Sequence, residues 1–308
     1  MSIGAGLGII GFSFADAGEF WRWVELCDNG GVDSLWQSDR LIGTDPHLET
    51  MSVMAALAGG TKRLKFGMNV ASLGWRDPVL TAKACATIDV LSNGRLLPAF
   101  GVGSPRSRDF AATGTSATGH GARTAEALEI ISRLWREDHL NFSGQYFRLD
   151  DASIAPKPIQ QPLPLWVGGS SRDAIERTAR WGTGWQAGIE SPAQVAPVIA
   201  TIKARSAELG RPIDEDHFGA GFACRFGRAD EAVVIRHDEM IAKLTGNSAR
   251  GLSVAGDAEE IVALINEFRG SGVRKFILRP IAIDAEDLLA QTRRFIEELL
   301  PRIKAMNR

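Results

Sequence analysis

The chain alternates short apolar runs with longer segments of helical periodicity, and this alternation constrains its fold more than any other feature. Eight apolar runs have the length of strands: Gly6–Ile10, Asp33–Gln37, Leu64–Val70, Arg95–Gly103, Leu165–Val167, Gly184–Ala187, Phe218–Phe226 and Arg274–Pro280. Strands that are separated by helices pair in parallel, with right-handed crossovers. Eight such units close most simply into a (β/α)8 TIM barrel, and 308 residues are enough for one. We therefore predict an α/β fold with a single barrel domain over residues 1–308.

Helices are expected between these runs, because apolar residues recur there at helical spacing. Their expected positions are 19–29, 47–58 (opened by Pro46), 78–91, 122–137, 172–180, 192–209, 257–269 and 285 onward. The alternative fold is an open doubly wound sheet, which usually carries a GxGxxG turn after its first strand. Neither GIIGFSFADAG nor the later GVGSPR fits that pattern, so the barrel is preferred.

Three segments depart from the regular alternation. Pro98 predicts an irregularity in the fourth strand, because proline cannot donate a hydrogen bond to the ladder. Residues 139–163 form an insertion before the fifth strand, in which NFSGQYF predicts a hairpin and APKPIQQPLP an extended connector. The polar, glycine-bearing end of residues 227–256 makes that segment a candidate for a mobile lid.

Composition excludes several classes of protein. The net charge is −2 and no basic cluster is interleaved with aromatic residues, so we expect no nucleic-acid partner. The three cysteines are far apart and the histidines lack metal-ligand spacing, so neither a disulfide framework nor a metal site is expected. The apolar N-terminus has no basic leader, and no apolar run reaches the roughly 18 residues of a membrane span. By elimination we expect a cytoplasmic protein with no membrane contact.

The turn Gly168–Gly169–Ser170–Ser171 lies between the fifth strand and its helix, and two explanations fit it. Glycines without a Cβ and free N–H groups at a helix N-terminus allow a phosphate to approach closely. A serine can also simply cap the helix, with no ligand. In a barrel this turn lies at the C-terminal end of the strands, where active sites gather, and that position favours a phosphate.

Other polar residues reach the same end of the predicted barrel. Asp39 and Arg40 follow the second strand, where they could orient a substrate or form a solvated ion pair. Three tryptophans, Trp36, Trp166 and Trp185, are expected to be packing residues. No nucleophile elbow, Cys–His pair or pair of carboxylates is visible at the rim, which suggests that a cofactor carries the chemistry.

The order of motifs resembles the bacterial luciferase-like family of flavin-dependent oxidoreductases. The matching pieces include GGVDSLWQSDRLI, TKRLKFGMNV, LSNGR with FGVG, FAATG, GARTAEALEIISRLW and LPLWVGGSSRDAIERTARWGTGW. They keep the family's order and spacing over residues 1–190, and the barrel pattern continues to the end of the chain.

The resemblance implies a cofactor and the residues that bind it. Members bind FMN or, in one branch, the deazaflavin coenzyme F-420, with the phosphate against the turn that matches Gly168–Ser171. Arg123 matches a family arginine that pairs with this phosphate, and such a contact is bidentate and charge-assisted. Asn69–Val70 falls where the family often has a non-proline cis peptide behind the ring. Gly103 and Ser104, at the rim after the fourth strand, complete the expected cofactor contacts.

Two departures from the family pattern bear on the reaction. Arg40 stands where many members carry a histidine, and arginine cannot act as a base near neutral pH. No glutamate stands near Ser104, where deazaflavin-dependent sugar-phosphate dehydrogenases carry a catalytic one. Dehydrogenation of an alcohol by that route is therefore disfavoured, whereas reduced FMN with oxygen needs less acid–base help.

Three hypotheses follow. The favoured one is a two-component FMN-dependent monooxygenase that acts on a small organic molecule and receives reduced FMN from a separate NAD(P)H-dependent flavin reductase. The second is a deazaflavin-dependent hydride-transfer oxidoreductase, and the third is a non-catalytic flavin-binding barrel. Under the first, Arg40 and Asp39 are the candidate catalytic residues. We also expect a homo-oligomer such as a dimer.

Overall fold

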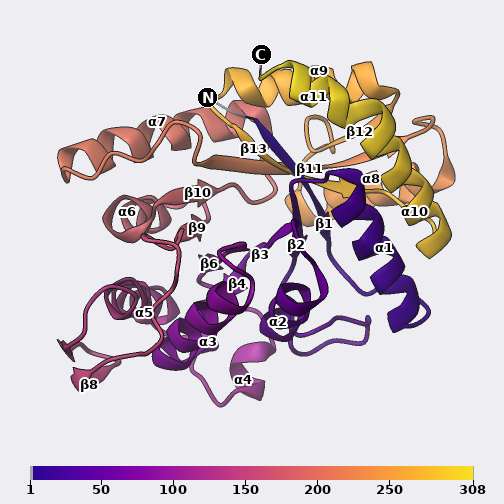
Figure 1. Cartoon of the computed structure of the whole chain (residues 1–308). Helices are drawn as coiled ribbons and strands as arrows, with labels where there is room; N and C mark the ends of the chain where they lie inside the picture. Colours follow the sequence, from indigo (N-terminus) through magenta and orange to yellow (C-terminus); the bar gives the residue numbers. More distant parts are fainter. Residues whose placement is uncertain (1–2, 308) are drawn as a thin grey trace.

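Eight parallel strands follow one another around a closed ring, and helices lie around its outside (Figure 1). The computed structural model describes residues 3–307. The ring contains β1 (Gly4–Ile9), β2 (Ser34–Gln37), β3 (Lys65–Met68) with β4 (Ala71–Ser72), β5 (Leu96–Leu97) with β6 (Ala99–Gly101), β9 (Trp166–Gly168), β10 (Gly184–Gln186), β11 (Phe218–Phe226) and β13 (Lys275–Pro280). The predicted α/β barrel with parallel strands is confirmed.

The ring closes through its two divided strands. β3 pairs with β5 and β4 pairs with β6, so the third and fourth strands run side by side along their whole length. β6 then pairs with β9, and β1 pairs with both β2 and β13. The fourth strand is interrupted between β5 and β6 at Pro98, as the missing N–H donor of proline predicts.

The helices between the strands follow the expected order. They are α1 (Ala17–Gly30), α2 (Thr50–Gly60), α3 (Pro78–Leu91), α4 (Asp109–Ala112), α5 (His120–Leu134), α6 (Arg172–Trp181), α7 (Pro192–Glu208), α8 (Ala232–Thr245), α9 (Ala258–Gly270), α10 (Ala285–Arg294) and α11 (Leu300–Ala305). A short 3-10 turn, Leu73–Trp75, precedes α3, and a π-helical turn, Phe295–Leu299, joins the last two helices.

One predicted helix start is wrong. Pro46 was expected to open the second helix, but α2 begins at Thr50. The carboxylate of Glu49 caps it by accepting from the N–H groups of Met51 and Ser52 at 3.1 and 2.7 Å. The carbonyl of Pro46 is used elsewhere, because it accepts from the N–H of Phe12 at 2.8 Å and ties this loop to the segment after β1.

The segment before the fifth strand contains two strands that are not part of the ring. β7 (Leu140–Ser143) and β8 (Arg148–Ala152) form an antiparallel pair of their own. Residues 227–256 contain α8 and one further strand, β12 (Ser253–Gly256), which pairs in parallel with β11 and was not predicted. Movement of this segment as a lid stays a prediction.

Two tryptophans occupy the inside of the ring. Trp36 and Trp166 are both 6% exposed and form one buried cluster with Ala99 and Ile277. Glycines on the neighbouring strands leave room for these indoles. A Cβ on Gly67 would lie 2.6 Å from Trp36 Cζ3, and a Cβ on Gly184 would lie 2.5 Å from Trp166 Cε2. Such distances are below van der Waals contact, so the large rings depend on the missing side chains.

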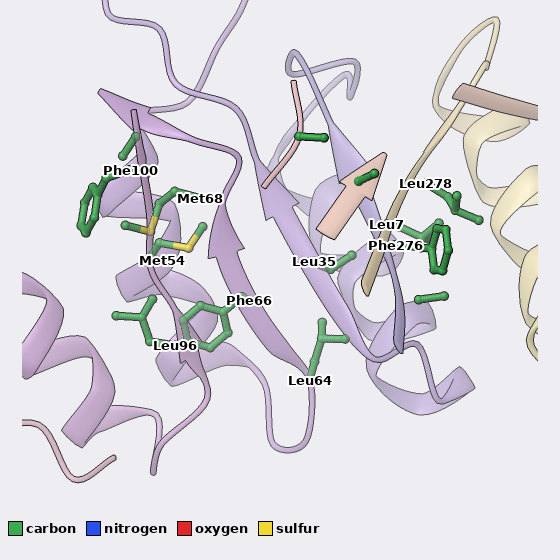
Figure 2. Close-up of a cluster of buried hydrophobic side chains, with 14 of the residues drawn as sticks. Leu7, Leu35, Met54, Leu64, Phe66, Met68, Leu96, Phe100, Phe276 and Leu278 are labelled. Carbon is green, nitrogen blue, oxygen red and sulfur yellow. The ribbon is translucent and has the colours of Figure 1, made fainter. Parts of the chain in front are cut away.

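The larger core lies between the strands and the helices. Successive side chains of a strand point to opposite faces, so Leu7, Leu35 and Phe66 alternate with the residues that face the inside of the ring. Figure 2 shows part of this layer, where Met54 of α2 lies beside Met68 of β3. Its residues are nearly all apolar, as expected for parallel strands, because the sheet is covered on both faces.

The two ends of the described chain meet beside β1 (Figure 1). The N–H of Ile3 donates to Asn307 Oδ1 at 2.6 Å, and Asn307 Nδ2 donates to the carbonyl of Ile3 at 3.0 Å. Among residues 3–307, no helix combines the length and the apolar character that crossing a bilayer would require.

We predict that Gly184→Ala lowers the free energy of unfolding by about 1–3 kcal/mol, because the new methyl group would overpack the ring against Trp166. Gly59→Ala is the matched control, since Gly59 lies inside α2 with nothing within 4 Å of an added Cβ. That change should be neutral or stabilising by up to about 1 kcal/mol. Urea unfolding of both variants measures the difference, and equal stabilities would contradict the packing argument.

Candidate cofactor and substrate site

The turn Gly168–Ser171 joins the end of β9 to the start of α6, and it is held in place from β10. Gly169 has a φ of 103°, which favours glycine. Trp185 Nε1 donates to the carbonyl of Gly169 at 2.8 Å, so this buried indole of β10 holds the turn in place. Ser171 Oγ accepts from the N–H of Ala174 at 3.2 Å and caps α6, as the serine pattern predicts.

Buried polar atoms without partners occur in this turn and on α5, the helix that packs against α6. Within residues 3–307, Ser170 Oγ, Arg123 Nε and Thr124 Oγ1 have no hydrogen-bond partner. Buried polar atoms are normally hydrogen-bonded, and leaving one unpaired costs about 1–3 kcal/mol. One such atom in the turn before α6, and two on the helix packed against α6, are consistent with a ligand that supplies the missing partners.

Arg177 is a second cation at the same place, and the sequence analysis did not identify it. It belongs to α6 and is only 7% exposed, yet it makes no hydrogen bond or ion pair with any residue that the structure describes. A Cβ on Gly121 would lie 3.7 Å from Arg177 Nη1, so the guanidinium reaches the first turn of α5. Burial lowers the pKa of this guanidinium, although the carboxylate of Asp173 partly opposes that effect.

The hairpin of the insertion forms one wall of the site. The carboxylate of Glu126 accepts from the N–H groups of Gln145, Tyr146 and Phe147 at 2.7, 2.9 and 3.1 Å, which anchors the tip of the hairpin on α5. The guanidinium carbon of Arg123 lies 4.4 Å from the centre of the Phe147 ring, a cation–π distance. The insertion thus positions Arg123, a role that its placement outside the barrel repeat did not suggest.

The opposite wall contains the peptide between Asn69 and Val70, which is cis, as the resemblance implied. Val70 packs across the mouth of the ring: a Cβ on Gly168 would lie 3.1 Å from Val70 Cγ1, and one on Gly101 would lie 2.8 Å from Val70 Cγ2. The structure therefore brings Asn69, Val70 and Gly168 to one place.

Gly103 and Ser104 lie further along the rim. Gly103 has a φ of 77°, and a Cβ on it would lie 2.5 Å from Trp75 Cζ3, so this glycine allows the chain to pass the indole. Ser104 is exposed, and its Oγ accepts from the N–H of Arg106 at 3.3 Å. Within residues 3–307, neither residue forms a hydrogen bond with the turn at Gly168.

Asp39 is part of a buried ion pair. Its carboxylate binds Arg76 through two hydrogen bonds of 2.6 and 2.8 Å and also accepts from the N–H of Ser72 at 2.9 Å. Arg76 in addition lies 3.4 Å from a carboxylate oxygen of Glu49, and its pKa is raised because these two carboxylates outweigh the effect of burial. The Asp39 side chain is 1% exposed, so it links β2 to β4.

Arg40 points elsewhere. Its Nη1 lies 3.2 Å from Asp45 Oδ2, and the two side chains are 41% and 80% exposed. The sequence analysis considered an ion pair between Arg40 and Asp39. That pairing is wrong, because Arg40 pairs with Asp45 and Asp39 pairs with Arg76. A titratable group that the sequence analysis did not identify lies nearby: His47 Nε2 is 3.0 Å from Ser38 Oγ, at the end of β2.

Comparisons with known proteins agree on the kind of protein this chain resembles. The family model described as luciferase-like monooxygenase matches residues 4–263. An F420-dependent glucose-6-phosphate dehydrogenase of Amycolatopsis mediterranei is 28% identical over 90% of this chain and 91% of its own length. An FMNH(2)-dependent dimethylsulfone monooxygenase of Pseudomonas putida is 30% identical, over 56% of this chain and 48% of its own. Among solved structures, the monooxygenase RslO1 from Streptomyces bottropensis has a TM-score of 0.84 at 22% identity, covering 97% of this chain and 99% of its own.

We predict that Asp39→Asn lowers the free energy of unfolding by about 3–5 kcal/mol, because the change leaves the guanidinium of Arg76 buried without its main carboxylate. Asp45→Asn is the matched control at the exposed pair with Arg40, and should change stability by no more than about 1 kcal/mol. Chemical denaturation of both variants provides the measurement. A small effect at Asp39 would show that this ion pair does not hold the two strands together.

Proposed function

The chain belongs to the luciferase-like monooxygenase family, and from this premise we propose that it is a two-component FMN-dependent monooxygenase of a small organic molecule. Its relatives are flavin- or F420-dependent oxidoreductases, and this chain is an enzyme of that class. The proposal depends on one observation above all. The side chains of Ser170 in the turn, Arg123 on α5 and Arg177 on α6 have no hydrogen-bond or ion-pair partner within residues 3–307.

These residues fit a cofactor phosphate. The N-terminus of α6 offers backbone N–H groups and the positive end of a helix dipole. Arg123, Arg177 and Ser170 would supply further donors, and a phosphate can satisfy all of them at once. FMN and the deazaflavin coenzyme both carry a phosphate, so this cradle supports a cofactor of either kind. The peptide Asn69–Val70 would then lie behind the ring system.

The choice of FMN is supported by the lack of a free acid or base at Asp39 and Ser104. Both oxygens of Asp39 are engaged by Arg76, and Ser104 is not a titratable group. Bound reduced FMN would itself supply the activation of oxygen, which leaves this chain the tasks of positioning the substrate and excluding water. Arg40 is half-exposed, and within residues 3–307 its one ion pair is with the exposed Asp45, so it keeps enough freedom to contact an anionic substrate or the reduced ring. Reduced FMN would come from a separate flavin reductase.

The alternative is hydride transfer with a deazaflavin, and two observations favour it. The relative that matches 90% of this chain is an F420-dependent dehydrogenase. His47 also reaches the end of β2, where it contacts Ser38, and Ser38 Oγ in turn donates to the carbonyl of Ile10 at 2.7 Å. A histidine in this position could serve as a base in place of the histidine that Arg40 replaces.

Cofactor binding and oxygen dependence separate these candidates. FMN and the deazaflavin are titrated separately, and oxygen uptake is then followed with NADH, a flavin reductase and a panel of substrates. FMN binding with substrate-dependent oxygen uptake supports the monooxygenase. Preferential deazaflavin binding with anaerobic substrate-dependent reduction supports the alternative. Flavin binding without turnover in either assay would instead indicate a non-catalytic barrel.

We predict that Arg177→Gln weakens FMN binding by about 10- to 100-fold, the usual worth of a charge-assisted hydrogen bond. Riboflavin lacks the phosphate, so its weaker binding should not change further in this variant. Arg180→Gln is the matched control on the same helix, because Arg180 is exposed and pairs with Glu176. Flavin fluorescence titration measures the affinity of the wild type and of both variants for FMN and for riboflavin. Equal losses for FMN and riboflavin would mean that Arg177 does not contact the phosphate.

A second prediction concerns the turn itself. Gly169→Val should weaken FMN binding at least about tenfold, since valine disfavours a φ of 103° and its side chain would crowd the approach of the phosphate. Arg123→Ala should weaken FMN binding as well. Wild-type affinity in both variants would place the cofactor phosphate elsewhere.

A further inference from the structure

A cavity of about 180 Å³ opens at the C-terminal ends of β1, β11 and β13. This is the end of the ring at which the cofactor turn also lies, but the cavity lies two to four strands around the ring from β9, at β11, β13 and β1. Much of its wall is apolar, formed by Ile9, Ile10, Ile281 and Leu288. Polar groups, among them Arg279, His237 and Ser13, form much of the remaining wall. A concave pocket that combines apolar side chains with a few placed polar groups is typical of a site for a small molecule.

One arginine enters this cavity without a counter-ion. Arg279, on β13, faces the inside of the ring between two glycines. A Cβ on Gly8 would lie 3.5 Å from Arg279 Cγ, and one on Gly221 would lie 3.2 Å from Arg279 Nη1. The guanidinium makes one long hydrogen bond, of 3.5 Å, to the carbonyl of Gly221, and it has no ion pair within residues 3–307. Burial lowers its pKa, and the thiol of Cys224 is the one ionisable group that opposes this effect.

A second arginine, on the strand that pairs with β13, has its positive charge neutralised by carboxylates. Arg225 of β11 is bound by the carboxylates of Glu231 and Asp287, each at 2.7 Å, and also donates to the carbonyl of Ile281. At this position the fold therefore supplies two carboxylates and a carbonyl to a structural arginine. Arg279, whose guanidinium is left with one weak carbonyl contact, is placed instead as a donor for something that enters the cavity.

The other polar groups of the cavity are compatible with an anion. His237 of α8 lines the wall; its Nδ1 lies 3.1 Å from Asp238 Oδ1, and its Nε2 has no partner within residues 3–307. Asp284 is the one carboxylate in the lining, but it is exposed and caps α10 by accepting from the N–H of Asp287 at 2.9 Å. Solvent screens its charge, so it opposes an anion at Arg279 only weakly.

We propose that this cavity binds the charged end of the substrate, and that the substrate is a small organic anion with an apolar body and a terminal carboxylate or sulfonate. Arg279 would bind the anionic group, His237 would donate or accept at its side, and the isoleucines would enclose the apolar part. The inference builds on the proposed function, since the cofactor would occupy the other side of the same mouth.

Matched six-carbon probes test this directly: hexanoate, hexanesulfonate and hexyl phosphate against the neutral hexanol. Binding is measured by calorimetry on the full chain, with and without saturating FMN. Wild-type protein should prefer at least one of the carboxylate and sulfonate probes to hexanol by about tenfold or more. FMN should not displace that anion, whereas an anion held at the cofactor cradle would be displaced.

Variants then assign the preference to Arg279. Arg279→Met should abolish it, and Arg279→Lys should keep part of it, which also covers the case in which the methionine variant does not fold. Arg302→Met, at an exposed position of α11, is the control and should bind as wild type does. Circular dichroism and FMN titration confirm that each variant is folded and loads cofactor.

Three outcomes would overturn the inference: equal binding of anions and hexanol by wild type, an anion preference that survives Arg279→Met, or displacement of the anion by FMN. A preference for hexyl phosphate alone would also overturn it, because the proposal is for a carboxylate or sulfonate. If wild type binds neither flavin nor deazaflavin, the proposed function is wrong, while the anion preference is still read from the cofactor-free titrations.

Discussion

The packing of Trp36 and Trp166 inside the ring is the constraint on which the rest of the molecule depends. Two indoles fit there because glycines face them from the neighbouring strands, as Gly67 and Gly184 do. The two indoles fill much of the interior, which is consistent with ligand sites at the ends of the barrel strands. At the C-terminal end the glycines continue, but smaller or charged groups now face them: Val70 against Gly168, and Arg279 beside Gly221. Glycines therefore make room for the large indoles inside the ring, and other glycines at the C-terminal ends of the strands lie beside the smaller Val70 and the charged Arg279.

What distinguishes a functional charge from a structural one at this mouth is whether the fold supplies its partner. The ion pair of Asp39 with Arg76 is buried and bidentate, and it fastens two strands. Arg177 is buried and Arg279 is partly buried, and neither has a carboxylate at hydrogen-bond distance within residues 3–307. An unpaired buried cation is costly, and it persists where a ligand compensates for it during function. By this criterion Asp39 has a structural partner, whereas Arg177 and Arg279, which no sequence motif marks, are the candidates for ligand binding.

Sequence patterns predicted the fold well because each barrel unit is locally encoded. The helix Pro78–Leu91 and the strand Phe218–Phe226 have the predicted bounds, since Asp77 with Pro78 defines a helix start and nine successive buried residues define a strand. β12 has only four half-buried residues and owes its pairing to β11, so its own sequence gives little indication of it. The candidate site was harder, because Arg177 is identified by the absence of a partner, which only the packed structure shows. The role of the hairpin in holding Arg123 likewise depends on contacts between distant segments.

The distribution of unpaired charge also bears on how the enzyme would recruit its ligands. The whole chain carries a net charge of −2, so long-range attraction for anions cannot come from its overall charge. Arg123 and Arg177 lie on one side of the mouth and Arg279 on the other, each in a place of reduced solvent screening. Fixed charges in such a low-dielectric cleft act more strongly on a nearby anion than the same charges on an open surface. A cofactor phosphate on one side and a substrate anion on the other would therefore be drawn to separate positions. Mutual repulsion would keep each from the other's arginine, and the space between the two positions is where the cofactor ring and the apolar part of the substrate would meet.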